Sequence, residues 1–273
     1  MTGIPLVKSH AFGNDFVLVD EQALAPSLDR PSFARAVCER HRGLGADGLV
    51  IFREQPAGGA TFDLLNADGS HSELSGNGVR CLAAWLVGRR ADGEPSRRSV
   101  DIFTEAGVKR LDLIEREGGR FTFRASMGQP AEIARRSLEV HGRPLDVVTL
   151  RVGNPQCVVL GEVTEPRLHL LGAALAVHPY FPEGTNVELA MVEAPDLVRI
   201  LIWERGVGPT EASGTGACAA AVAAMQYGGA ARDVQVVAPG GAQRVEWTAE
   251  GLFLTGWAEV IAEARWLRAT GAE

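Results

Sequence analysis

Two short turns of the same pattern contain the first residues that could do chemistry. Ser75-Gly-Asn-Gly78 and Ser213-Gly-Thr-Gly216 each precede a run rich in alanine, leucine and valine. Glycines at the start of a helix let backbone N–H groups point outward at its positive end, where they bind a carboxylate or a phosphate. Taken singly, each turn favours a structural role in which the glycines make a tight strand-to-helix turn and the serine caps its helix. The recurrence of the turn favours anion binding.

The order of landmarks along the chain repeats once. The repeated pairs, with their offsets, are Gly13-Asn14 and Gly153-Asn154 (140 residues), Asp47 and Asn186 (139), Asn66 and Glu204 (138), and the two serine turns (138). A nearly constant offset predicts two homologous halves that meet near residues 120–130. We expect one domain at 1–125, joined by a C-terminal strand at 262–273, and a second at 126–261. Two-fold pseudo-symmetry would bring both turns to the domain interface, where clefts usually lie.

Each half is expected to contain the same elements. Alternating and β-branched apolar runs predict strands at 16–19, 48–52, 62–65, 147–152, 157–160, 187–191 and 200–203. Helices should run from Val79 to about Arg89 and from Ala217 to about Gln226, each buried inside the sheet of its own half. A further helix is expected in each half, one with Pro31 in its first turn and Gly43 as the stop, and one over 167–177. The predicted fold class is α+β, with two pseudo-symmetric domains, each a mostly antiparallel sheet wrapped around a central helix.

Composition and charge exclude several classes of function. The 273 residues are 46% hydrophobic and carry a net charge of −7, which disfavours nucleic acid and anionic membranes as partners. The N-terminus lacks the features of a signal peptide, so a cytoplasmic location is expected. The four cysteines and six histidines show no metal-ligand spacing, and no dinucleotide fingerprint is present. Neither a metal nor another cofactor is therefore expected, and the cysteines are expected to be buried and reduced.

Eight segments match one family in order, from about residue 7 to residue 265. They are His10-Ala-Phe-Gly-Asn-Asp15, Arg42-Gly-Leu-Gly-Ala-Asp-Gly48, Asn66-Ala-Asp-Gly69, Ser75-Gly-Asn-Gly-Val-Arg-Cys81, Gly153-Asn-Pro155, Gly184-Thr-Asn-Val187, Trp203-Glu-Arg-Gly-Val-Gly208 and Ser213-Gly-Thr-Gly-Ala-Cys218. In these motifs the chain resembles the diaminopimelate epimerases. That family interconverts the LL and meso stereoisomers of diaminopimelate, a step of lysine biosynthesis, without pyridoxal phosphate. The resemblance implies the same fold, with a last strand around 257–266 that returns to the first domain. A homodimer is the expected assembly.

The resemblance also implies an amino-acid site. Ligands for the distal amino and carboxylate groups would be Asn14, Asn66, Asn154, Asn186, Glu204 and Arg205. The carboxylate at the reacting carbon would lie against Gly76-Asn77 and Gly214-Thr215. These residue types suit a zwitterion, because amide oxygens and a carboxylate bind ammonium groups, whereas a guanidinium and helix N-termini bind carboxylates.

The chain departs from the family at the groups that move protons. The family has a cysteine where this chain has Ser75 and Ser213, and a histidine where it has Gln156. A thiol has a pKa of ~8.5, whereas an alcohol is closer to water at ~15.7. The gap of roughly seven units corresponds to about 10 kcal/mol, and a helix dipole supplies only ~0.3–2 kcal/mol. A serine becomes a useful base only beside another base, for which His71, Glu73 and Glu211 are the nearby candidates.

Three interpretations of these changes remain open. Ser75, Ser213, Gln156 and Glu204 are the candidate catalytic residues of an epimerase that works by another base, or of a racemase or dehydratase acting on a different amino acid. The serines could instead be engineered to keep substrate in an inert site, although the additional change at Gln156 argues against this. In the third interpretation the chain binds an amino acid without chemistry. A serine-hydrolase function is disfavoured, since no nucleophile elbow accompanies Ser75.

Overall fold

The computed structural model describes residues 3–56, 59–89 and 99–267. The chain forms two compact units. Unit 1 comprises the described residues up to Arg124 together with those from Trp257 onward, and unit 2 is Ala125–Gly256. The first boundary lies beside the expected one at 125/126, and the chain returns to unit 1 at Trp257, five residues before the expected 262.

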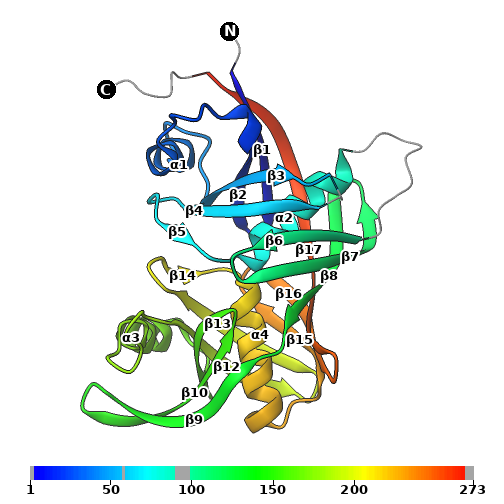
Figure 1. Cartoon of the computed structure of the whole chain (residues 1–273). Helices are drawn as coiled ribbons and strands as arrows, with labels where there is room; N and C mark the ends of the chain where they lie inside the picture. Colours follow the sequence, from blue (N-terminus) through cyan, green and yellow to red (C-terminus); the bar gives the residue numbers. More distant parts are fainter. Residues whose placement is uncertain (1–2, 57–58, 90–98, 268–273) are drawn as a thin grey trace. The chain divides into compact units, whose positions relative to one another are not determined.

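Unit 1 is a sheet with a helix on each face. Its elements are β1 (Ile4–Ala11), β2 (Asn14–Asp20), η1 (Glu21–Ala23), α1 (Arg30–Cys38), β3 (Gly48–Glu54), β4 (Ala60–Asn66), β5 (His71–Ser72), α2 (Gly76–Gly88), β6 (Ser99–Thr104), β7 (Gly107–Glu117) and the first part of β8 (Arg120–Gly128) (Figure 1). Alternate residues of β2, such as Val17 and Val19, pack with α1 in one apolar cluster. Because successive strand residues point to opposite faces, the other face is left to α2, which contacts β1, β2, β6 and β7.

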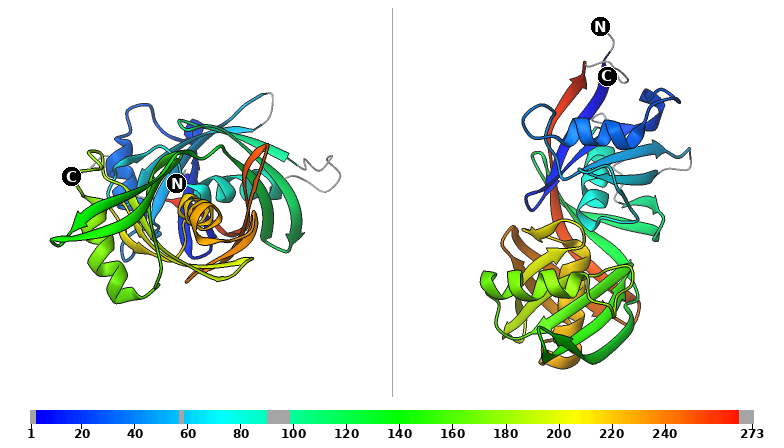
Figure 2. Two further views of the ribbon diagram at one scale, coloured as in Figure 1. Left: turned by 90° about the horizontal axis from the view of Figure 1, so that it is seen from below. Right: turned by 90° about the vertical axis from the view of Figure 1, so that its left-hand side faces the viewer.

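Unit 2 surrounds a central helix with strands. Its elements are β9 (Ala131–Val140), β10 (Arg143–Val152), β11 (Asn154–Leu160), α3 (Glu165–Ala176), β12 (Asn186–Ala194), β13 (Leu197–Glu204), β14 (Gly208–Thr210), α4 (Gly214–Ala223), the π-helical turn η2 (Ala224–Gly228), β15 (Asp233–Ala238) and β16 (Gly241–Thr248). Every residue of α4 is buried. The helix contacts β10, β11, β12, β13, β15 and β16, and Figure 2 (left) shows it nearly along its axis. The strand β17 (Gly251–Trp266) begins in unit 2 and ends in unit 1.

The strand registers confirm the internal repeat and correct one of its landmarks. Phe16 pairs with Gly48 in parallel β2 and β3, as Gln156 pairs with Asn186 in parallel β11 and β12. Leu49 pairs with Leu65, as Val187 pairs with Trp203. Asn186 therefore occupies the place of Gly48, and its expected equivalence to Asp47 was wrong by one residue. The difference matters because a shift of one residue in a strand reverses the side-chain face.

Three of the predicted helices begin earlier than expected. α2 and α4 begin at Gly76 and Gly214, because Ser75 and Ser213 are the N-cap residues and their hydroxyls accept hydrogen bonds from the third residue of each helix. α3 begins at Glu165 rather than at 167. The helix expected to run on to Gly43 ends at Cys38, and a turn closed by Gly43 N–H donating to Glu39 O follows it. No helix among the described residues is long and apolar enough to cross a membrane.

Candidate functional site

The turn at the start of α2 places a buried amide behind the Ser75 cap. Ser75 Oγ accepts a hydrogen bond from Gly78 N–H at 3.1 Å, and the Ser75 side chain is partly exposed. Asn77 is buried, and its Nδ2 donates to Asn14 Oδ1 at 3.0 Å. The guanidinium of the buried Arg80 donates in turn to Asn77 Oδ1. Unit 1 thus brings Ser75, Gly76, Asn77 and Asn14 together.

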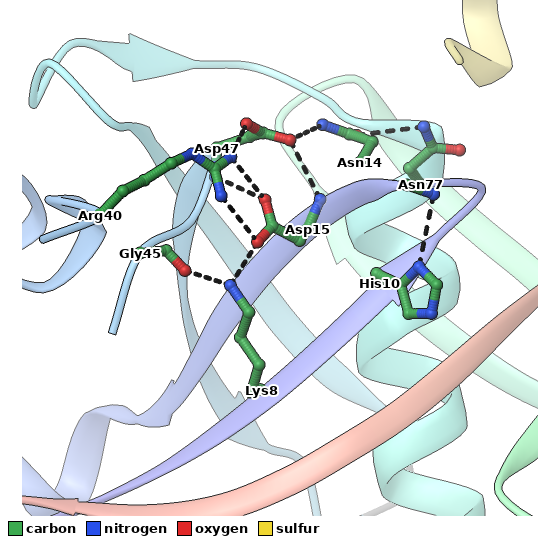
Figure 3. A network of polar contacts seen from close by, with 9 residues as sticks. Lys8, His10, Asn14, Asp15, Arg40, Gly45, Asp47 and Asn77 are labelled. Carbon is green, nitrogen blue, oxygen red and sulfur yellow. Dashed lines mark hydrogen bonds and ion pairs between the residues drawn. The ribbon is translucent and has the colours of Figure 1, made fainter. Parts of the chain in front are cut away.

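A charged network holds Asn14 from its other side (Figure 3). Asn14 Nδ2 donates to Asp47 Oδ2 at 2.8 Å, and Asp15 N–H donates to the same oxygen at 3.0 Å. Arg40 bridges Asp47 and Asp15 at 2.7 and 3.0 Å, and Lys8 contacts Asp15. Asp47 entered the sequence argument only as a landmark of the repeat, and the structure makes it the residue that orients Asn14.

The two carboxyl groups of this network titrate differently. Burial raises the pKa of Asp47, and the neighbouring charge of Asp15 raises it further. Burial acts in the same direction on Asp15, but hydrogen bonds from Arg40 and Lys8 outweigh it, so that the pKa of Asp15 is lowered. The opposite directions keep Asp15 ionised as the partner of both cations.

The remaining unit 1 candidates lie around the end of β4. Asn66 ends that strand, and its Nδ2 donates to Ser70 Oγ at 3.0 Å. His71 is exposed and lies 3.5 Å from Asp63 and 3.3 Å from Glu105, so two carboxylates engage it. Glu73 is exposed as well. The structure shows no hydrogen bond from either helper candidate to Ser75.

The turn at the start of α4 is more deeply buried. Ser213 Oγ accepts from Gly216 N–H at 3.2 Å and lies 3.4 Å from Thr215 Oγ1. Both side chains are buried. Glu211, the helper candidate in this half, is exposed, and its backbone carbonyl accepts from Gly240 N–H. Glu211 is therefore a surface residue of the loop.

The candidate ligands of unit 2 gather on adjacent strands. Gln156 is fully buried and pairs with Asn186 across β11 and β12, and its Nε2 donates to Asn154 Oδ1 at 2.5 Å. Asn186 Oδ1 accepts from Arg205 N–H at 2.9 Å, which ties it to the end of β13. The exposed Arg205 guanidinium donates to Glu183 O at 2.8 Å. Glu204, the last residue of β13, directly precedes it.

A carboxyl that the sequence argument missed lies against the Ser213 turn. Glu188 is fully buried, and neither of its oxygens has a hydrogen-bond partner in the structure. A Cβ placed on Gly216 would lie 2.8 Å from Glu188 Oε1 and 3.3 Å from Ser213 Oγ. The sequence pattern predicts an apolar strand over 187–191 that includes Glu188. Its spacing of two residues from Asn186 was the available signal, because such residues share one face of a strand.

The environment of Glu188 favours its protonated form. Burial raises the pKa of Glu188 well above its usual range, and the negative charge of Glu204 raises it further. The N-terminus of α4 acts in the opposite direction but is the weaker effect. Glu188 therefore holds its proton at pH values where an exposed glutamate has lost it.

This environment makes the stability of the protein depend on pH through Glu188. A carboxyl whose pKa is raised by folding stabilises the native state fully below its unfolded pKa of ~4.3, and this contribution is lost as pH rises toward the folded pKa. Glu188→Gln removes the ionisation and keeps the shape. We expect the free energy of unfolding of the variant to rise relative to wild type between pH 5 and 8, by at most about 1.4 kcal/mol per pH unit.

Urea unfolding at each pH provides the measurement. Glu193→Gln is the control on the same strand, because Glu193 pairs at the surface with Arg199, and its difference from wild type should stay constant over this range. A constant difference for Glu188→Gln would show that Glu188 ionises normally in the folded protein.

Burial disfavours the thiolate form of three of the four cysteines. All four lie in the described part of the chain, and all are buried and free of disulfides. Burial raises the pKa of Cys38 and of Cys81 to about 12 and also raises that of Cys157. A thiol with such a pKa is almost wholly protonated at neutral pH and is a poor base. Among the described residues, no cluster of histidine, cysteine and acidic side chains is suited to hold a metal ion.

Comparison with known proteins places the chain in a family. The family model described as diaminopimelate epimerase matches residues 6–132 and 148–261. The protein named diaminopimelate epimerase from Desulforudis audaxviator is 38% identical, with 96% of this chain and 99% of that protein covered. The one from Synechococcus elongatus is 37% identical, with 93% and 94% covered.

Solved structures show the same fold at lower sequence identity. A phenazine biosynthesis protein from Bacillus anthracis has a TM-score of 0.73 at 14% identity, with 98% of this chain and 100% of that chain covered. A probable proline racemase from Agrobacterium radiobacter also has a TM-score of 0.73, at 17% identity, with 96% and 92% covered. The fold is thus that of the epimerases and racemases, and the chain belongs to the diaminopimelate epimerase family.

Proposed function

We propose that the chain is an epimerase that acts on diaminopimelate without pyridoxal phosphate, by removing the proton on the α-carbon and returning one. The family supports this proposal, since the matched relatives carry that name over nearly their whole length. One structural observation supports it most strongly. Each unit contains a serine-capped, glycine-flanked helix N-terminus and a pair of side-chain amides that bond each other.

The proposed binding mode follows from these groups. Backbone N–H groups of Gly76-Asn77 and of Gly214-Thr215 would bind the carboxylate at the reacting carbon, because helix N-termini attract anions. The distal amino-acid head would be bound by Asn14, Asn66, Asn154, Asn186, Glu204 and Arg205. In this binding mode both turns bind the same substrate molecule. The proposal therefore includes a pseudo-symmetric arrangement of the two helix-centred sheets.

The serines set a limit on the chemistry. A serine hydroxyl can deliver a proton to a carbanion, which is a much stronger base than the alkoxide left behind. Removing the α-proton is different, because an alcohol oxygen becomes a useful base only when another base takes its own proton. The proposed reaction therefore needs a base in addition to Ser75 and Ser213.

Calorimetric titration tests whether the chain recognises its proposed substrate. We expect a binding heat with both LL- and meso-diaminopimelate. Binding to L-lysine should be weaker, because lysine lacks the second carboxylate that Arg205 would bind. If no diamino diacid and no basic amino acid gives a heat, the proposed substrate is wrong.

We further propose that the protein works in the cytoplasm, in lysine biosynthesis, as a homodimer. The negative net charge and the family support these assignments. Size-exclusion chromatography with light scattering tests the assembly, and a mass of a single 29.1 kDa chain would contradict it.

A further inference from the structure

The buried carboxyl of Glu188 and the Ser213 hydroxyl both lie against Gly216 at the start of α4. The two distances from the Cβ position on Gly216 limit the separation of Glu188 Oε1 and Ser213 Oγ to about 6 Å. A bridging water with hydrogen bonds of about 2.8 Å to each oxygen would connect them at any separation below about 5.6 Å. Ser213 caps the helix whose N–H groups would bind the substrate carboxylate.

A second unpartnered group lies on the same strand face. Gln156 Oε1 is buried and has no hydrogen-bond partner in the structure. Gln156 of β11 pairs with Asn186 of β12, and Glu188 is two residues beyond Asn186 in β12. The side chains of Gln156 and Glu188 therefore lie on the same face of the sheet, toward α4. Buried water typically binds two to four otherwise unsatisfied polar groups. Glu188, Gln156 and Ser213 would together supply three.

We propose that Glu188 is the proton store behind Ser213, exchanging a proton with the substrate α-carbon through the Ser213 hydroxyl. This proposal rests on the proposed function. Glu188 acts through Ser213 and does not contact the substrate, so it is a positioning and proton-storing residue rather than a catalytic residue.

The step balances without a further reactant. The α-C–H bond breaks, and its electron pair stays on the α-carbon and its carboxylate. Ser213 Oγ takes the proton while its own proton passes to the bridging water, and the water gives one to the Glu188 carboxylate. The reverse sequence returns a proton to the same face of the carbon. The raised pKa of Glu188 makes its carboxylate a stronger base than an exposed glutamate.

The groups that face Glu188 are few. Glu204 of β13 is the neighbouring charge, α4 contributes only Cys218 as a titratable side chain, and β11 contributes Cys157. No described cation is among the charges that shift Glu188. The protonation of Glu188 therefore depends on burial and on one acid, and both raise its pKa.

Unit 1 has no acid at the position that corresponds to Glu188. By the strand registers, the place of Glu188 is taken by Val50, which is buried. A Cβ placed on Gly78, the equivalent of Gly216, would lie 3.2 Å from the ring of Phe62. Among the described residues, only the Ser213 turn has a buried acid at the position of Glu188. The proposal therefore predicts that a proton is exchanged faster on the face of the α-carbon toward Ser213 than the carbon is inverted.

The test compares wild type with Glu188→Gln and Glu188→Asp in D2O, following the α-hydrogen of diaminopimelate by NMR. We expect Glu188→Gln to lower the rate of exchange by at least about 100-fold, the lower end for general acid–base assistance, while the calorimetric Kd changes less than about threefold. The wild-type rate should rise with pH through an apparent pKa above that of an ordinary glutamate. This rise of the rate with pH should be absent in Glu188→Gln and retained in Glu188→Asp. Glu193→Gln on the same strand should exchange at the wild-type rate.

The outcomes separate the two proposals. Normal binding with a wild-type exchange rate and pH profile in Glu188→Gln overturns the role of Glu188 and leaves the proposed function standing. Wild type that binds diaminopimelate without exchanging its α-hydrogen overturns that role and the proposed reaction with it, and leaves only the proposed ligand. Wild type that binds no diaminopimelate overturns the proposed function and the inference with it. If Glu188→Gln is poorly folded, Glu188→Asp decides, because loss of the rise with pH from a folded and binding variant that keeps the carboxyl contradicts the proposal.

Discussion

Replacing Ser75 and Ser213 together by cysteine should raise α-proton exchange on diaminopimelate by at least about 100-fold over the serine protein. The binding groups around both turns are in place, and each serine already sits at the cap of a helix N-terminus. That position lowers the pKa of a thiol, so the new groups would be partly ionised at neutral pH. An alcohol and a thiol differ by roughly seven pKa units. The substitution provides this difference directly, whereas the dipole of the helix could not provide it to a serine.

The single variants provide the control for this prediction. Ser75→Cys or Ser213→Cys alone should raise inversion much less than the double variant, because one group removes the proton and another delivers one to the opposite face. Exchange and inversion are read from the same NMR samples. A double-cysteine protein that folds and binds normally but stays inert would show that the thiols are not the missing element. Gln156→His would then be the change to add.

Arg205→Ala should weaken the binding of diaminopimelate by about tenfold to hundredfold. A hydrogen bond to a charged group contributes about 1.5–3 kcal/mol, and tenfold in affinity corresponds to about 1.4 kcal/mol. The guanidinium is exposed in the unliganded protein, so the lower end applies unless the ligand shields it from water. Its backbone N–H, held by Asn186, is retained in the variant, so the strand end should keep its geometry.

Calorimetry measures this change directly. Arg244→Ala is a matched control in the same unit, because Arg244 is an exposed arginine paired with Asp233 on β15, outside the candidate ligand set. Its Kd should equal that of wild type. Equal affinities of the Arg205 variant and wild type would remove Arg205 from the site.

The sequence predicted most of what depends on local pattern. The serine turns, the helices that follow them and the strand around 257–266 are recognisable because glycine spacing, capping and apolar periodicity act over a few residues. The errors at helix ends have the same scale, since a cap residue decides where a helix begins. The order of the landmarks also revealed the repeat, although Asp47 was matched to the wrong partner by one residue.

Contacts between distant residues were beyond this kind of argument. Asn14 is held by Asp47 and by Asn77, which are 33 and 63 residues away along the chain. Glu188 is a glutamate within an apolar strand, and nothing in its neighbours along the sequence shows that α4 buries it. The proximity of Glu188 and Ser213 follows from the packing of β12 against α4, which only the three-dimensional structure provides.

The α-hydrogen exchange of wild-type protein in D2O is the most direct test of the central claim, that this chain moves the α-proton of diaminopimelate from the side of Ser213 with Glu188 as the store. LL- and meso-diaminopimelate are incubated separately, and deuterium incorporation and interconversion are followed in the same NMR spectra. The account predicts incorporation at one configuration of the reacting carbon that runs ahead of the interconversion of the isomers. Absence of incorporation under conditions where calorimetry shows binding would contradict it, and so would exchange and inversion at equal rates from both isomers.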